Sequence, residues 1–182
     1  GNMDDFDAAD VASGIQELYE PLAEDSGMTL RVKTTQAPVH GNRELISQAL
    51  ANLVENAIKY GKPLPSIQPL GDGAVDGANE ILIEARRDGA SVLLSVTDHG
   101  PGIPEADRSH AVERFVRLEA SRTQPGSGLG LSLASAVATL HGGELRLGDS
   151  NPGLTATLAI PARAGASDRL AAQTPDVPQK VA

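Results

Sequence analysis

The chain has 182 residues, which suffices for one domain with a substantial core and is too short for two ordinary domains with a linker. Aromatic residues make up only 2% of it, and its net charge of −9 repels phosphate backbones and anionic lipid, so nucleic acid and membrane surfaces are disfavoured as partners. The chain has no cysteine, which excludes disulfides and thiolate metal sites and favours the cytoplasm as its compartment.

The first part of the chain predicts two helices and a strand. Apolar residues recur at helical spacing over residues 7–26 until a Ser-Gly pair stops the pattern. Residues 28–35 then alternate between apolar and polar, which is typical of a half-buried strand. A Gly-Asn pair supplies a cap for a strongly periodic helix over residues 44–60, which ends at a glycine.

The rest of the chain predicts strands, one further helix and irregular segments. Residues 62–79 are rich in proline and glycine and are expected to form a loop. The later elements are a hairpin around an Asp-Gly turn, a helix and a closing hairpin, expected over residues 81–86, 91–98, 129–141, 144–147 and 154–160.

One domain is expected over residues 7–162. Residues 1–6 are interpreted as a cloning remnant followed by a lead-in. Residues 163–182 are rich in Ala, Pro and polar side chains without a sustained period, and they are expected to form a disordered tail.

The helix over residues 44–60 has two distinct faces. At roughly 100° per residue, its apolar residues share one arc, while Asn52, Asn56 and Lys59 share another. A solvated face is one interpretation of these polar residues, and it stays open. Helix interiors disfavour Asn, however, and amide oxygens beside an ammonium group can bind Mg²⁺ and phosphate. The polar arc therefore favours a metal and phosphate site.

A glycine-containing segment follows the strand predicted over residues 91–98. It places Asp98 at the strand end, followed by Gly100 and Gly102. This is either an ordinary turn or a site where the carboxylate accepts a hydrogen bond from an exocyclic amino group such as that of adenine. In the second interpretation, the glycines let the backbone approach the base without a Cβ clash.

A second glycine stretch, G-S-G-L-G at residues 126–130, opens a predicted helix, where free backbone N–H groups can receive phosphate. It matches neither the Walker pattern nor the dinucleotide fingerprint. Between the two stretches lies V-E-R-F-V-R at residues 112–117. This segment is either an amphipathic turn or the source of an arginine for a γ-phosphate, with Arg117 and Arg122 as the candidates.

These segments occur in an order that resembles one protein family. The four segments N-L-V-E-N-A-I-K-Y, D-H-G-P-G-I-P, V-E-R-F-V-R and G-S-G-L-G-L-S-L-A resemble the N, G1, F and G2 boxes of sensor histidine kinases. The resemblance extends over about residues 7–161 and includes the closing G-L-T-A-T-L-A-I-P.

The resemblance implies an α+β fold, the two-layer α/β sandwich of Bergerat type, in which helices cover one face of a mixed β-sheet. It also implies that the domain binds ATP and Mg²⁺. The residues implied at the metal and phosphates are Asn56 as the Mg²⁺ ligand, with Asn52, Lys59, Arg117 and Arg122 near phosphate. Those implied at the base, nucleoside and phosphate lid are Tyr60, Asp98, Gly100, Gly102, Thr155, Gly126, Gly128, Leu129 and Gly130. Asn52, Lys59 and Arg117 are the residues expected to take part in catalysis.

The same comparison implies slow ATP hydrolysis. Gyrase and heat-shock chaperone ATPases resemble this pattern but place a Glu one helical turn before the metal-binding Asn, where it activates water. Here that position is Asn52, and an amide cannot act as a general base. Glu55 lies roughly 300° from Asn52 around the helix and should point elsewhere.

A histidine kinase also needs a phospho-accepting histidine, and none here fits the family's H box, because His40, His99 and His141 precede Gly and His110 precedes Ala. The acceptor is therefore expected on an upstream dimerisation domain outside this sequence. The resemblance implies a homodimeric parent protein and a response regulator as its partner. The isolated chain is expected to bind ATP without phosphorylating itself. The domain is expected in the cytoplasm. Because many members of the family it resembles are membrane sensors, the full-length parent protein is expected to be anchored in the inner membrane.

Two other hypotheses remain. One is a serine kinase of the same fold, of the anti-sigma-factor type, and the other is an inactive nucleotide-binding docking module. The lead-in typical of a chain that follows a helical hairpin argues against the first. The presence of Asn56, Gly128 and Gly130 argues against the second.

Overall fold

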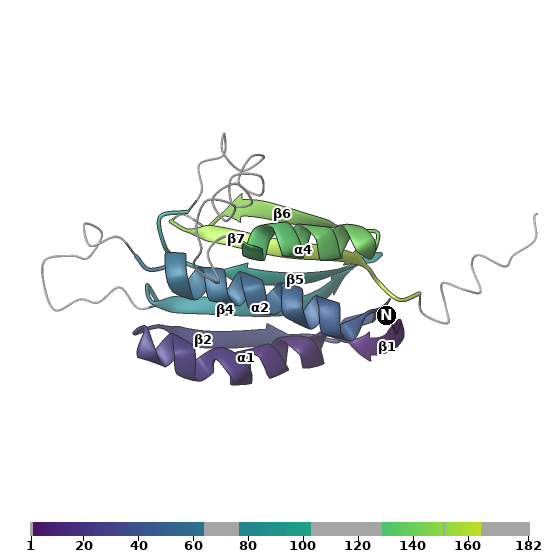
Figure 1. The fold of residues 1–182 in the computed structure, drawn as a ribbon, viewed down its shortest axis with the longest axis horizontal. Coiled ribbons are helices and arrows are strands. Elements are labelled where there is room, and N and C mark those ends of the chain that lie inside the picture. The colour runs from purple at the N-terminus through teal and green to yellow at the C-terminus, as the bar shows by residue number, and fades with distance from the viewer. Residues whose placement is uncertain (1, 64–76, 103–128, 151, 165–182) are drawn as a thin grey trace, which may run out of the picture.

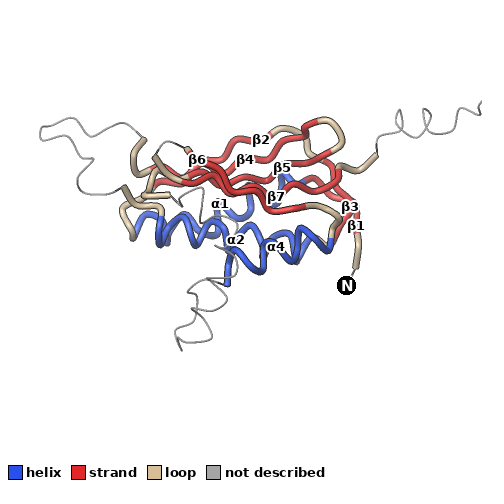
Figure 2. The backbone as a smooth tube through the Cα atoms, turned by 90° about the horizontal axis from the view of Figure 1, so that it is seen from above, coloured by secondary structure: helices blue, strands red, loops and turns tan. Residues whose placement is uncertain are grey.

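The computed structural model describes residues 2–63, 77–102, 129–150 and 152–164. A five-stranded sheet forms one layer and helices α1, α2 and α4 form the other (Figures 1 and 2). This arrangement confirms the predicted two-layer α+β fold with helices on one face of a mixed sheet.

The five-stranded sheet combines one parallel pair with three antiparallel pairs. Its strand order is β2-β4-β5-β7-β6, in which β2 runs parallel to β4. The antiparallel pairs β4–β5, β5–β7 and β7–β6 complete the sheet, so β5 lies at its centre. The strand bounds are Thr29–Thr34 for β2, Glu80–Asp88 for β4, Ser91–Thr97 for β5, Glu144–Asp149 for β6 and Leu154–Pro161 for β7.

The helices begin and end where the sequence predicts. Helix α1 spans Ala8–Asp25, α2 spans Arg43–Tyr60 and α4 spans Leu129–Leu140. Asn42 caps α2 through its side-chain oxygen, which accepts a hydrogen bond from the Leu45 N–H at 3.0 Å, as expected for a residue with a short polar side chain at this position.

The core between the two layers consists mainly of aliphatic side chains, as the scarcity of aromatic residues predicts. It joins the apolar face of α2 to the inward-facing residues of the central strands. Burying one such side chain contributes about 1.5–3 kcal/mol to folding. The largest fully buried residues include Ile46, Leu50, Ile81, Ile83, Leu94, Leu158 and Ile160.

A second, two-stranded sheet was not predicted. Strand β1, Asp4–Asp7, pairs antiparallel with β3, Pro38–Gly41. Each strand has four residues, which is too short for an alternating pattern to stand out. Arg163 contacts this small sheet, because its N–H donates to the Pro38 carbonyl at 2.9 Å and its Nε lies 3.4 Å from Asp5 Oδ2.

Several predictions fall outside the described residues: most of the predicted loop, the arginine-containing segment, most of the second glycine stretch and the tail beyond residue 164. No helix within the described residues combines the length and the apolar character needed to cross a bilayer.

Candidate functional site

A cavity of about 230 Å³ opens where α2 and α4 meet the ends of β5 and β7. Most of its wall is apolar, with a buried carboxylate and an amide among the lining groups. The residues that line it are Leu53, Asn56, Ala57, Tyr60, Val96, Asp98, Pro101, Gly102, Leu131, Leu154 and Ala156. Such a cavity suits a flat, largely apolar group that carries a hydrogen-bond donor.

Asp98 supplies the buried carboxylate of the cavity. It follows β5 directly, and its side chain is only 7% exposed. Its Oδ1 accepts hydrogen bonds from the Gly100 N–H at 3.0 Å and the Leu154 N–H at 3.2 Å. Burial raises the pKa of Asp98, although these two backbone bonds and the nearby His99 act in the opposite direction. The two backbone hydrogen bonds thus hold the carboxylate in place, but they offset only part of the cost of burying its charge.

Three glycines pack closely around Asp98. Gly61 ends α2, and a Cβ at Gly61 would lie 2.7 Å from the Asp98 Cβ. A Cβ at Gly100 would lie 2.7 Å from the Gly61 carbonyl carbon, and Gly153 has a φ of +120° and faces the Asp98 carbonyl. Glycine at these positions lets the end of α2 approach the strand end that carries the carboxylate.

Gly102 also packs closely against neighbouring backbone. Its φ is +72°, a left-handed conformation that side chains rarely adopt, and a Cβ there would lie 2.7 Å from the Gly153 carbonyl oxygen. The structure therefore explains glycine at both predicted positions after Asp98 through close backbone packing beside the cavity.

Helix α2 contributes four of the lining residues, including Asn56 and Tyr60. The Nδ2 of Asn56 is buried and has no hydrogen-bond partner within the described part of the chain. A buried donor without a partner is costly, and in a cavity wall it points to a bound group. The two amide atoms exchange places by a half turn of the side-chain amide group, so the same residue can offer either a donor or an oxygen ligand.

The other two polar residues of this helix arc lie beside the cavity rather than in its wall. Asn52 is half-buried one turn before Asn56, Lys59 is exposed, and neither lines the cavity.

Glu55 points away from the cavity, as the helix geometry predicted. Its Oε1 accepts a hydrogen bond of 2.8 Å from the hydroxyl group of Tyr19 on α1. Burial, together with this bond and the charge of Glu55, raises the pKa of Tyr19 to about 12, so the phenol remains a donor. Glu55 is therefore tied to the neighbouring helix and does not face the site.

Thr155 lies on β7 between two lining residues, Leu154 and Ala156, but does not line the cavity itself. Its Oγ1 is 3.1 Å from Thr97 Oγ1 on β5. Because side chains alternate along a strand, both threonines face away from the helices. Thr155 therefore lies on the face of the sheet opposite the cavity, while its neighbours Leu154 and Ala156 line the cavity.

Six predicted site residues either lie outside the described residues or are placed only by their backbone. Arg117, Arg122, Gly126 and Gly128 lie outside the described residues. Leu129 and Gly130 form the first two positions of α4, which agrees with the prediction that the glycine stretch opens a helix.

No sequence pattern predicts the apolar wall of the cavity. It comes from four separate elements, and its members include Leu53, Ala57, Val96, Leu131, Leu154 and Ala156. Each of these residues also fits an ordinary core position, so no local pattern distinguishes a cavity wall from the core. In the sequence, Gly61 marks only the end of a predicted helix and Gly153 only the start of the closing segment, although both pack against Asp98.

Comparisons with known proteins agree with this fold. Residues 41–164 match the family described as histidine kinase-, DNA gyrase B-, and HSP90-like ATPase. The chain is 35% identical over 169 residues to the sensor-like histidine kinase SenX3 of Mycolicibacterium smegmatis, covering 87% of this chain and 40% of the relative. It is 37% identical over 122 residues to the histidine-protein kinase/phosphatase MprB of Mycolicibacterium paratuberculosis, covering 67% of this chain and 21% of the relative.

A solved structure of the mycobacterial sensor histidine kinase MprB superposes with a TM-score of 0.68 at 26% identity, covering 90% of this chain and all of that one. The chain belongs to the family of histidine kinase-, DNA gyrase B- and HSP90-like ATPases, and within that family it is the ATP-binding catalytic domain of a sensor histidine kinase. It spans about two fifths or less of the length of these curated relatives.

Proposed function

We propose that the cavity holds the adenine of ATP, with Asp98 accepting a hydrogen bond from the exocyclic amino group. The observation that carries this proposal is a buried carboxylate, held by two backbone N–H groups, in an otherwise largely apolar cavity. An apolar wall favours a planar base, and the carboxylate distinguishes an amino group from a carbonyl. Tyr60, which lines the cavity and is half exposed, is assigned to the nucleoside side.

The phosphates and Mg²⁺ are assigned to the polar side of α2. Asn56 is assigned to the metal through its side-chain oxygen, because Mg²⁺ takes oxygen ligands and keeps several waters and phosphate oxygens around it. Its buried Nδ2 has no hydrogen-bond partner among the described residues, which suits a side chain that meets a bound group. No cluster of three or more His, Cys, Asp or Glu suited to a metal occurs among the described residues, so the nucleotide itself would supply much of the coordination. Bound Mg²⁺ would offset the negative charge of the phosphates.

The remaining predicted residues are assigned to the phosphate chain. Asn52 and Lys59 flank Asn56 on α2 and are proposed as phosphate contacts. Arg117 or Arg122 is proposed at the γ-phosphate. The glycine stretch that leads into α4 is proposed as the lid, because a helix N-terminus favours anions. Thr155 is retained only as a support behind the base.

The domain would position the γ-phosphate for attack by an imidazole from another domain. Phosphoryl transfer of this kind depends mainly on positioning and charge neutralisation. Within the described part of α2, the position that carries a water-activating Glu in related ATPases is Asn52, and Glu55 is bonded to Tyr19. Slow hydrolysis by the isolated chain is the expected consequence.

The partners are proposed from the same reasoning. The acceptor histidine would lie on an upstream dimerisation domain of a homodimeric parent protein, and a response regulator would receive the phosphoryl group. The sensor kinase relatives are longer than this chain, which leaves room for such a domain.

Labelled ATP tests the proposal directly. The chain with Mg²⁺-ATP should release phosphate slowly and gain no label, whereas an added upstream helical domain should gain acid-labile, base-stable label. Rapid phosphate release would instead indicate an ATPase, and label on an added serine substrate would favour the serine kinase hypothesis. A chain that fails to bind ATP would be the inactive docking module.

A further inference from the structure

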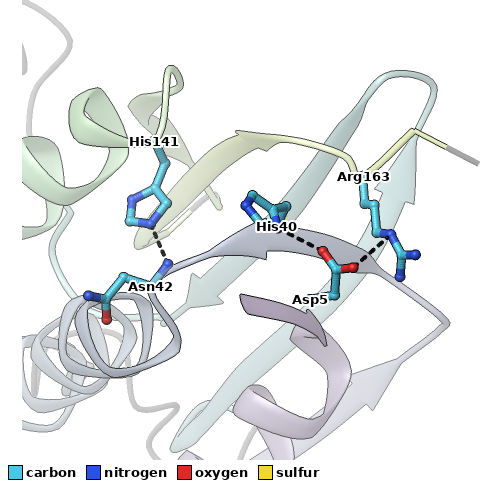
Figure 3. A network of polar contacts seen from close by, with 5 residues as sticks. All are labelled: Asp5, His40, Asn42, His141 and Arg163. Atoms are coloured by element: carbon cyan, nitrogen blue, oxygen red, sulfur yellow. Dashed lines mark hydrogen bonds and ion pairs between the residues drawn. The ribbon is translucent and has the colours of Figure 1, made fainter. Parts of the chain in front are cut away.

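The imidazole ring of His141 links the two helices that line the cavity. His141 follows α4, and its Nδ1 lies 2.7 Å from the carbonyl oxygen of Val137, one turn earlier. Its Nε2 accepts a hydrogen bond of 3.0 Å from the backbone N–H of Asn42, the residue that caps α2 (Figure 3). One ring therefore joins the end of α4 to the beginning of α2.

The partners of the two ring nitrogens fix their roles. A carbonyl oxygen can only accept, so Nδ1 must carry the hydrogen that it donates to Val137. A backbone N–H can only donate, so Nε2 must carry none. The bonding pattern therefore requires the neutral ring with its hydrogen on Nδ1.

The backbone beside the His141 ring leaves little space between the ring and the start of α2. A Cβ at Gly41 would lie 2.8 Å from Cδ2 and 3.0 Å from Nε2 of His141, so only glycine lets the ring sit this close to the backbone before α2. Asn42 meanwhile uses its side-chain oxygen to cap Leu45. Both the N–H and the side chain of the capping residue are thus engaged, and the start of α2 is held at a fixed place relative to α4.

The same two helices enclose the cavity at their other ends. Leu131 near the start of α4 faces Leu53, Asn56 and Ala57 on α2 across the cavity. From His141 the cavity lies roughly 15 Å away along α4, at about 1.5 Å per residue. The bond and the cavity therefore sit at opposite ends of one pair of packed helices.

We propose that His141 is a positioning residue for the nucleotide site: its bond to Asn42 fixes the relative position of α2 and α4, and thereby the width of the cavity between them. The proposal rests on the assignment of this cavity to the nucleotide. His141 makes no contact with the cavity and acts through the two helices.

Two substitutions at His141 test the roles of its two ring nitrogens separately. His141→Gln places an amide oxygen where Nε2 accepts from Asn42, whereas His141→Asn keeps a donor for Val137 but is too short to reach Asn42. Substitutions at residues that connect packed elements away from a binding site typically change the ligand affinity at that site a few-fold. We expect His141→Asn to weaken Mg²⁺-ATP binding about three- to tenfold and His141→Gln to bind nearly as the unmodified chain does.

Gly142→Ala is the matched control. Its φ is +76°, so a side chain strains the backbone, yet the new Cβ would meet only Pro161 at 3.8 Å and the bond to Asn42 stays. Titration calorimetry would be done at a temperature where circular dichroism shows every variant folded. Equal losses of affinity in His141→Asn and Gly142→Ala, or in His141→Asn and His141→Gln, would overturn the positioning role, as would no loss in His141→Asn.

NMR supplies a readout that is independent of affinity. The His141 ring should carry hydrogen on Nδ1 and none on Nε2, and the Asn42 amide proton should shift in His141→Asn but not in Gly142→Ala. A ring with hydrogen on Nε2 would overturn the proposal. If the unmodified chain binds no ATP at all, the assignment of the cavity fails, and the NMR result still decides whether the link between the helices exists.

Discussion

The surroundings of Asp98 act in opposite directions on the charge of its carboxyl group. Burial favours its neutral form, and the backbone N–H groups of Gly100 and Leu154 favour the carboxylate. A ligand amino group would add a further donor to the carboxylate. A residue that lowers the stability of the ligand-free domain is typical of a binding site, where the ligand supplies the hydrogen bond that the carboxylate lacks.

Replacing Asp98 by Asn should reduce the preference for adenine over guanine. Guanine presents a carbonyl where adenine presents an amino group, and an unpaired buried group costs about 1–3 kcal/mol, which is roughly ten- to hundredfold in affinity. Competition of ATP and GTP for a fluorescent nucleotide measures the ratio. An unchanged ratio in the variant would mean that Asp98 does not contact the base.

The same variant should not destabilise the empty domain at neutral pH. The folded pKa of Asp98 is raised above an unfolded value of about 3.9, so between the two values the folded chain retains a proton that the unfolded chain has lost. Stability therefore falls as pH rises through this window, and the penalty persists at pH 7. Asn keeps an oxygen for both backbone donors and removes the penalty.

Urea midpoints measured without nucleotide over a pH series would test this expectation. Asp98→Asn should be at least as stable as the unmodified chain at pH 7, and its advantage should shrink as the pH falls through the titration of the carboxyl. A variant that is less stable by a pH-independent amount would contradict the assigned direction.

A substitution at Asn56 tests the proposed Mg²⁺ ligand. Asn56→Ala removes the proposed oxygen ligand and should weaken Mg²⁺-ATP by at least tenfold while changing the affinity for metal-free ADP much less. Metal-free ADP serves as the control, because it meets the same altered wall without the ion. Equal losses for the two ligands, measured by calorimetry, would rule out a metal ligand.

At the scale of elements, the site depends on how closely the end of α2 approaches the end of β5. Gly61 closes α2 and lies against Asp98, and Gly100 lies against Gly61. The contact involves backbone atoms on both sides, so it cannot relax by a change of rotamer. Tyr60 and Asp98 therefore come to the same cavity because of glycines that do not line it.

Gly100→Ala should disrupt this contact. Its Cβ would lie 2.7 Å from Gly61 and 2.8 Å from the Tyr60 carbonyl oxygen, so α2 or the strand end must move. We expect a loss of about 1–3 kcal/mol in stability together with weaker ATP binding. Gly148→Ala is the control, since nothing lies within 4 Å of its Cβ. Thermal unfolding and calorimetry of both variants would show whether the effect belongs to Gly100 alone.

At the scale of the whole molecule, the cavity draws its wall from α2, α4, β5 and β7, which lie far apart in the sequence. The helices pack on the same sheet that supplies Val96 and Ala156 (Figure 2). A ligand in this cavity contacts both layers at once, so its binding energy should stabilise the fold as a unit.

Saturating Mg²⁺-ATP should therefore raise the melting temperature of the whole domain. A ligand at 100 times its Kd adds about 2.7 kcal/mol, which corresponds to roughly 5–11 °C for a domain of this size. Calorimetric scans should show one transition that shifts as a whole. A GTP-induced shift of equal size, or an equal ATP-induced shift in Asp98→Asn, would contradict the proposed adenine site.

Sequence alone determined the three helices, the strands of the five-stranded sheet and the polar residues of the candidate site. The 3.6-residue period placed α2 and its face with Asn52, Asn56 and Lys59, and the glycines after β5 marked the strand end that carries Asp98. These features are local, because propensity, capping and turn chemistry act over a few residues. The order of the four segments that begin at Asn52, Asp98, Val112 and Gly126 then sufficed to indicate the family.

Tertiary structure alone decided which residues share the cavity. Asn56 lines it and Asn52 does not, although both belong to one polar arc, because α4 and β7 close only one side of α2. No local pattern predicted the short pair β1 and β3, the choice of Tyr19 as the partner of Glu55, or the hydrogen bond from Asn42 to His141, 99 positions away. Such contacts join distant segments, and their geometry is fixed only when the two layers pack, which no period within one segment can encode.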